Sequence, residues 1–236
     1  MAKPKIKAVI FDVDNTLIDF MKFKELAIEE AIYAMIAAGL KKKRDEIWQV
    51  LDKIYLEKGI EYQHVFDDAL KILNGKIDYK MLASAIVAYR KVKAGHMEPY
   101  ANVIPTLIEL TRRGYKLGVI SDAPKLQMWT RLCELKLQCF FEFVISSEDV
   151  GEHKPSPLPF KHALKILKLK PEEVAMVGDN YDRDIYGAKK MGMMAILARY
   201  GRLKHKIAGA KPPKIEHKEI KPDLIIGDIS ELLEAL

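Results

Sequence analysis

Two aspartates stand two positions apart directly after a short apolar run near the start of the chain. Ala8–Phe11 is followed by Asp12, Val13 and Asp14. Alternate residues of an extended chain point the same way, so both carboxylates can face a common ligand. Two neighbouring anions repel each other unless a cation lies nearby, and Mg²⁺ takes hard oxygen ligands. The pair therefore predicts a magnesium site at the end of a strand.

A second group of acids follows another apolar run. Val174–Val177 leads into Gly178 and Asp179, and Asp184 stands five positions further on. In a doubly wound sheet the carboxyl ends of parallel strands lie at one edge, where ligands bind. We therefore expect these acids to lie close to Asp12.

Phosphate binding also requires donors, and two are placed suitably. Ser121 ends the apolar run that begins at Lys116, and Lys154 stands in His153-Lys154-Pro155. A lysine can neutralise charge on a transferring phosphoryl group, while a hydroxyl orients its oxygens. Acids and donors together indicate phosphoryl-transfer chemistry.

The elements that must position these residues alternate between strands and helices. Short apolar runs predict strands, and amphipathic stripes between them predict helices, among them Val103–Leu110, Phe160–Leu167 and Ile229–Leu236. This alternation is typical of an α/β protein with a Rossmann-like, doubly wound parallel sheet. The predicted strands end at or near Asp12, Ser121, Ser146, Asp179, Leu197 and Asp228.

The alternation is interrupted once. Four successive helical stripes fill the segment 20–98, and no strand pattern occurs among them. We expect this segment to be an all-helical cap domain that packs as a small bundle over the carboxyl ends of the strands. Residues 1–19 and 99–236 would then form a discontinuous α/β catalytic core.

Composition limits the classes of protein. The chain has 236 residues, of which 49% are hydrophobic and 31% charged, as in an ordinary globular protein. No apolar run approaches the roughly 20 residues that span a bilayer, so we expect a cytoplasmic protein with no membrane partner. The formal charge of +6 is concentrated in a basic segment, Arg202 to Lys221, which we interpret as a solvated loop rather than a nucleic-acid-binding surface.

Four motifs together make the chain similar to the haloacid dehalogenase superfamily. They are DVDNT at Asp12, Ser121-Asp122, HKPSPLPF at His153 and GDNYDRDIYGAKKMGM at Gly178, in the order found in that family. The resemblance is to the phosphatase branch with a helical cap after the first motif. It implies that Asp12 is the nucleophile, which forms an aspartyl-phosphate, and that Asp14 protonates the leaving oxygen and then activates water.

The resemblance also implies binding roles. Ser121 and Lys154 would hold the phosphate, and Asn15 and Ala123 would add backbone contacts. Mg²⁺ would be bound by Asp12, the backbone carbonyl of Asp14 and Asp179, while Asp184 would support the water shell of the metal.

These observations predict a magnesium-dependent phosphohydrolase that acts on a small phosphorylated metabolite. The second acid, Asp14, favours phosphate esters over carbon–halogen bonds or phosphonates. A phosphomutase of the same family remains open, because sequence does not show whether Asp12 returns its phosphoryl group to a sugar. A phosphorylation-dependent receiver domain, or a non-catalytic phosphate- or nucleic-acid-binding protein, is a weaker alternative. The motifs specify neither the substrate nor the oligomeric state.

Overall fold

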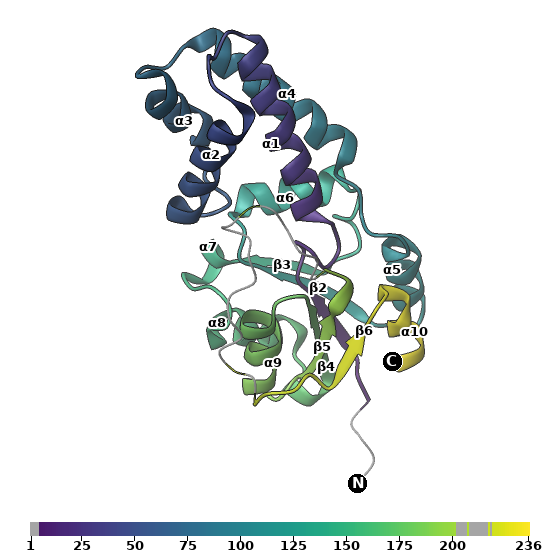
Figure 1. Ribbon diagram of the computed structural model, residues 1–236. Coiled ribbons are helices and arrows are strands. Elements are labelled where there is room, and N and C mark those ends of the chain that lie inside the picture. The colour runs from purple at the N-terminus through teal and green to yellow at the C-terminus, as the bar shows by residue number, and fades with distance from the viewer. Residues whose placement is uncertain (1–4, 202–206, 208–216, 218) are drawn as a thin grey trace. The chain divides into compact units, whose positions relative to one another are not determined.

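The computed structural model describes residues 5–201, 207, 217 and 219–236, and the chain divides into two compact units. One unit is built on the helical segment Phe20–Met97, and the other combines the residues that precede and follow it (Figure 1). No helix among the described residues is long and apolar enough to cross a membrane. Most of the basic segment from Arg202 to Lys221 lies outside the described residues.

The larger unit contains a sheet of six parallel strands. Its order is β3-β2-β1-β4-β5-β6, as in a doubly wound Rossmann-like fold. The predicted α/β class is confirmed, and each predicted apolar run contains a strand. The strands are β1 (Ala8–Phe11), β2 (Lys116–Ser121), β3 (Phe143–Ser146), β4 (Val174–Gly178), β5 (Met194–Ala198) and β6 (Leu224–Ile226).

The strand order reverses direction beside β1. Phe11 of β1 pairs with Val119 of β2 on one side and with Val177 of β4 on the other. The amide of Asp12 extends this ladder by donating to the carbonyl oxygen of Val177 at 2.9 Å. Ligands of open α/β sheets bind at such a reversal, outside the carboxyl ends of the strands. The residues after β1 and β4 are therefore in position for a site.

Helices cover both faces of this sheet (Figure 1). Phe160 of α8 and Ala188 of α9 are fully buried in one cluster with Ile10 and Met176 of the central strands. The predicted helix Ile229–Leu236 is wrong as a single helix: a 3₁₀ turn, Ile229–Glu231, precedes a short α10 (Leu232–Ala235). The other helices are α5 (Val103–Arg112), α6 (Lys125–Glu134), α7 (Ser147–Val150), α8 (Pro157–Leu167) and α9 (Tyr186–Lys190).

The described residues of the smaller unit form four helices, as the stripes predict. Apolar side chains such as Ile28, Ile47 and Leu70 are buried in it. Asp78 caps the N-terminus of the fourth helix, where its carboxylate accepts hydrogen bonds from the amides of Lys80 and Met81. The helices are α1 (Phe20–Ala37), α2 (Arg44–Lys58), α3 (Val65–Asn74) and α4 (Tyr79–His96).

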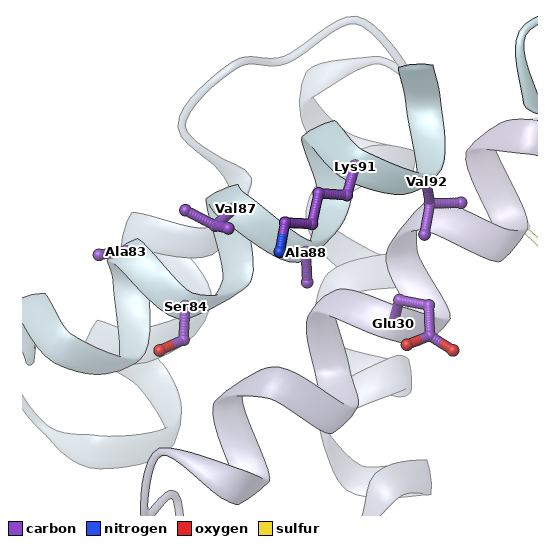
Figure 2. A pocket seen from close by; sticks show the side chains of 7 residues that line it. All are labelled: Glu30, Ala83, Ser84, Val87, Ala88, Lys91 and Val92. Atoms are coloured by element: carbon purple, nitrogen blue, oxygen red, sulfur yellow. The ribbon is translucent and has the colours of Figure 1, made fainter. Parts of the chain in front are cut away.

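Lys24 is a charged residue that is buried in this helical unit. The Nζ atom of Lys24 lies 4.8 Å from the ring centre of Tyr55 and 5.5 Å from that of Tyr89. Aromatic faces attract cations, so these rings stabilise the buried ammonium group. An open groove on the same unit is formed by Glu30 of α1 and six residues of α4, and Figure 2 shows its lining side chains.

Candidate active site

The loop after β1 carries the predicted nucleophile. Asp12 is only 6% exposed, and the chain turns at Asn15, whose φ of 59° lies in the left-handed region. Gly201 packs against the backbone carbonyl of Asn15 so closely that any Cβ would overlap it. The hydroxyl of Tyr200 donates to the carbonyl oxygen of Thr16 at 2.8 Å. The segment after β5 thus fixes the shape of the loop that holds Asp12.

The acids after β4 enter the site from the neighbouring strand. Asp184 lies in a π-helical turn, Tyr181–Ile185, and its Oδ2 accepts from the amide of Asn180 at 2.9 Å. A Cβ on Gly178 would collide with the carboxylate of Asp184. Glycine at this strand end therefore allows the buried carboxylate to fold back beside the sheet.

Lys154 joins the acids of the two strands. Its side chain is 1% exposed, and its Nζ lies 2.6 Å from Asp12 Oδ1 and 2.7 Å from Asp184 Oδ1. The same nitrogen donates to the carbonyl oxygen of Ile120 on β2 at 3.0 Å. A buried ammonium group requires such partners, because taking an isolated charge out of water is very costly. Three segments far apart in sequence therefore meet at one cation.

Burial and mutual repulsion control protonation at this site. Burial raises the pKa of Asp12 to about 7, although Lys154 opposes this shift. Burial also raises the pKa of Asp179, and the neighbouring charges of Asp12 and Asp184 add to the effect. Burial disfavours the charged form of Lys154, but attraction to Asp12 and Asp184 outweighs it and raises the pKa of Lys154. Lys154 thus stays charged while the carboxylates compete for too little positive charge.

The carboxylates are grouped closely enough to hold one metal ion. Asp12, Asp179 and Asp184 each offer an oxygen, and these atoms lie within 4.8 Å of one another. Asp179 Oδ1 is buried and has no hydrogen-bond partner among the described residues. A hard divalent cation suits this set, because carboxylate oxygens are the ligands that Mg²⁺ prefers. The donors that are present therefore fit such an ion.

Two predicted phosphate-binding residues lie together at the end of β2: Ser121 is its last residue, and Ala123 follows it. Ser121 and Ala123 are buried, and the amide of Ala123 donates to Ser121 Oγ at 3.2 Å. The carbonyl of the preceding residue, Ile120, contacts Lys154. Ser121 is therefore near the lysine that bridges the acids, as the sequence predicts. Its role in binding phosphate stays a prediction.

Asp14 lies apart from the three grouped carboxylates. Its side chain is 23% exposed, and its Oδ2 accepts from Arg131 Nη1 of α6 at 2.6 Å. The Asp14 carboxylate, on the same loop as Asp12, thus contacts a different cation, Arg131 of α6. The prediction that the backbone carbonyl of Asp14 binds the metal is not tested by these contacts.

Known proteins are similar to this chain in sequence and in fold. Residues 6–192 match the family model described as haloacid dehalogenase-like hydrolase. The chain belongs to this family. It is therefore an enzyme of the hydrolase class, and the resemblance that the four motifs predicted is confirmed.

Several hydrolases of this family resemble the chain over most of its length. The "Glyceraldehyde 3-phosphate phosphatase" of Methanocaldococcus jannaschii is 41% identical over 84% of this chain and 87% of its own. A protein of the same name from Methanothermobacter thermautotrophicus is 36% identical over 98% of this chain and 100% of its own. The crystal structure of a HAD phosphatase from Thermococcus onnurineus covers 98% of this chain and 97% of its own, with 26% identity and a TM-score of 0.68.

The hydrolase site includes residues that the sequence analysis did not single out. The carboxylate of Asp122 accepts from the amide of Lys154 at 2.9 Å and from Arg183 Nη1 at 3.2 Å, so it connects three of the motifs. Its position directly after Ser121 was a usable signal. Arg131 was detectable as a charged residue on the otherwise buried face formed by Met128 and Leu132. The contact between Gly201 and Asn15 has no such signal, because it depends on how β5 ends.

Proposed function

We propose that this hydrolase is a magnesium-dependent phosphatase that removes the phosphoryl group of a small phosphate monoester through an aspartyl-phosphate on Asp12. The observation that carries the proposal is the meeting of Asp12, Lys154, Asp184 and Asp179 where the sheet reverses its strand order. A buried nucleophile, a fixed cation and a metal-binding group of acids are the parts that phosphoryl transfer requires.

The first half-reaction transfers the phosphoryl group to the enzyme. One carboxylate oxygen of Asp12 attacks phosphorus, and the bond from phosphorus to the ester oxygen breaks. Asp14 gives a proton to that oxygen, so the alcohol departs neutral. Lys154, already in contact with Asp12, offsets negative charge on the transferring group. Ser121 and the backbone of Ala123 and Asn15 would hold the phosphoryl oxygens.

The second half-reaction regenerates Asp12. Asp14, now ionised, takes a proton from a water molecule, whose oxygen attacks phosphorus and breaks the bond to the Asp12 carboxylate. Inorganic phosphate then leaves, and Asp14 is again protonated. Each turnover thus consumes one ester and one water and yields one alcohol and one phosphate.

Asp12 and Asp179 would bind Mg²⁺ together with the backbone carbonyl of Asp14, and Asp184 would hold the water shell of the ion. When bound, Mg²⁺ supplies positive charge that stabilises the phosphoryl oxygens and keeps the carboxylates ionised. Two observations support this assignment. Among the described residues, Asp179 Oδ1 has no hydrogen-bond partner, and burial raises the pKa of Asp12, so a bound cation would stabilise both carboxylates in their charged form.

Glyceraldehyde 3-phosphate is the first substrate to test, because relatives with 36–41% identity carry that name. We further infer that the segment 20–98, which includes the four helices from α1 to α4, is the cap domain, with the catalytic core formed by residues 1–19 and 99–236. Side chains of the cap domain would select the alcohol part of the substrate, because the acids of the α/β unit would recognise only the phosphoryl group.

Phosphate release provides the test. Wild-type protein is incubated with glyceraldehyde 3-phosphate and a panel of sugar phosphates, phosphoglycolate and nucleoside monophosphates, with Mg²⁺ or with a chelator. We expect Mg²⁺-dependent release of inorganic phosphate, fastest from a three-carbon ester. Transfer of phosphate to a second hydroxyl without release would show a mutase instead. If the protein folds and binds Mg²⁺ but gives neither release nor transfer of phosphate, the proposal is contradicted.

A further inference from the structure

A buried arginine contacts the carboxylate that the proposed mechanism uses as acid and base. Arg131 lies in α6, and its side chain is only 4% exposed. Its Nη1 donates to Asp14 Oδ2 at 2.6 Å, across 117 residues of sequence. Both residues belong to the α/β unit. This contact joins the loop that carries Asp12 and Asp14 to α6, a helix that contains no residue of the four motifs.

Packing alone does not require an arginine at this position. The neighbouring residues Met128 and Leu132 on the same face of α6 are fully buried and apolar. A methionine or leucine would fill such a face without the cost of taking a guanidinium group out of water. Ion pairs of this kind are often no better for stability than apolar residues of similar size. The short ion pair with Asp14 supplies one reason for an arginine at this position.

We propose that Arg131 is a positioning residue that fixes the orientation of the Asp14 carboxylate for proton transfer to and from the reacting oxygens. The inference rests on the proposed function. A strong hydrogen bond to Oδ2 restricts rotation of the Asp14 side chain, which sits in a loop and is more exposed than Asp12. Proton transfer depends on hydrogen-bond geometry, so a carboxylate whose orientation is less restricted is a poorer acid and base catalyst.

The chemistry of arginine suits this role. The guanidinium group is a donor with no acceptor and does not lose its proton in proteins. It can therefore hold Asp14 throughout the cycle without entering the proton transfers. Its planar, rigid arrangement of donors also fixes direction, which the flexible ammonium group of a lysine does less well.

Leaving-group dependence separates this role from a merely structural one. An alkyl phosphate needs protonation of its leaving oxygen, whereas 2,4-dinitrophenyl phosphate does not. Loss of Asp14 positioning should therefore slow phosphoryl transfer from the alkyl ester much more than from the aryl ester. General damage to the fold or to Mg²⁺ binding would slow both esters alike.

The experiment compares Arg131→Met, Arg131→Lys, Asp14→Asn and the double variant Arg131→Met/Asp14→Asn, with Lys125→Met as control. Lys125 lies in the same helix and pairs with Asp149, so its replacement removes an ion pair of α6 without touching Asp14. Single-turnover transfer of the phosphoryl group to the protein is measured with glyceraldehyde 3-phosphate and with 2,4-dinitrophenyl phosphate, in saturating Mg²⁺. Thermal unfolding is recorded for every variant.

We expect Arg131→Met to slow transfer from the alkyl ester by about ten- to a hundredfold, a fraction of the roughly 10²–10⁴-fold that acid–base catalysis contributes, and transfer from the aryl ester by less than about threefold. In the Asp14→Asn background it should have no further effect. Arg131→Lys should recover part of the rate, and Lys125→Met should behave as wild type. If Arg131→Met does not fold, Arg131→Gln, which keeps one donor, replaces it throughout.

Equal slowing of both esters, or an undiminished effect of Arg131→Met in the Asp14→Asn background, would overturn the inference while leaving the phosphatase intact. An inactive wild-type protein that binds Mg²⁺ would instead overturn the proposed function, and the inference with it.

Discussion

The two compact units of this hydrolase bury charge in different ways. In the α/β unit, Asp12 and Asp184 both contact the ammonium group of Lys154 at the end of the sheet. In the helical unit, Lys24 is buried against the rings of Tyr55 and Tyr89. The first arrangement groups carboxylates around a cation, whereas in the second the rings contribute to the stability of a buried ammonium group. The comparison fits the proposal that the α/β unit carries the reaction, because its grouped carboxylates could hold a metal ion.

The largest expected effect is the loss of the nucleophile. Asp12→Asn removes the attacking oxygen and should lower phosphatase activity by at least about 10⁴-fold, since covalent catalysis then has no route. Phosphate release from glyceraldehyde 3-phosphate measures it. Asp182→Asn is the matched control, because Asp182 is an acid of the fourth motif that is not one of the three grouped carboxylates and accepts a hydrogen bond from the amide of His217. Comparable losses in both variants would contradict the assignment.

Replacement of the bridging lysine should have the next largest effect. Lys154→Met leaves Asp12 and Asp184 without their shared cation and should lower activity by about 10²–10³-fold, as for loss of one stabilising group at a transferring centre. Breaking this buried pair should also reduce the free energy of unfolding by about 3 kcal/mol in urea without metal. Lys7→Met, which removes an exposed ion pair with Glu173, should change stability by less than about 1 kcal/mol. Equal stabilities of the two variants would count against the bridge.

A smaller effect is expected from crowding the metal-binding acids. Gly178→Ala places a methyl group where the carboxylate of Asp184 lies and should weaken Mg²⁺ binding by about 10–100-fold, the usual result of disturbing groups that support a metal. Titration calorimetry measures the affinity. Gly95→Ala in α4 is the control, since nothing lies within 4 Å of the added Cβ and its affinity should match wild type. Unchanged affinity in Gly178→Ala would show that Asp184 does not support the site.

Per pH unit, the smallest expected effect is on the stability of the protein without metal. Burial raises the pKa of Asp12 from 3.8 to about 7, so between these values the folded state holds more protons than the unfolded state. Raising the pH through this window should lower the free energy of unfolding by at most about 1.4 kcal/mol per pH unit from this group, with no further loss above it. Urea unfolding across the window should show a shallower slope for Asp12→Asn than for wild type. Identical slopes would contradict the raised pKa.

Much of the α/β unit could be predicted from the sequence because its strands are short apolar runs with functional residues at their ends. The four helices of the other unit could be predicted from their stripes. Less regular elements could not: the π-helical turn Tyr181–Ile185 depends on the close approach of Asp184 to Gly178, and the last helix is shortened by a 3₁₀ turn that Asp228 caps.

The site shows the same division. Asp12, Asp179, Asp184 and Lys154 follow apolar runs or recognisable motifs, and the fold brings them together. Arg131 and Gly201 act through contacts across the tertiary structure, with Asp14 and with the carbonyl of Asn15. A linear pattern does not encode such contacts, because they depend on where two separate segments meet. The residues that contact the predicted site from other segments were therefore harder to predict than the site residues themselves.

The most direct test of the central claim is to trap the phosphorylated protein. Wild type is mixed with glyceraldehyde 3-phosphate and Mg²⁺, quenched in acid within one turnover, digested and examined by mass spectrometry. A phosphoryl group on Asp12, absent from Asp12→Asn, is the predicted result. Turnover without any phosphorylated peptide, or with the group on another residue, would contradict the account.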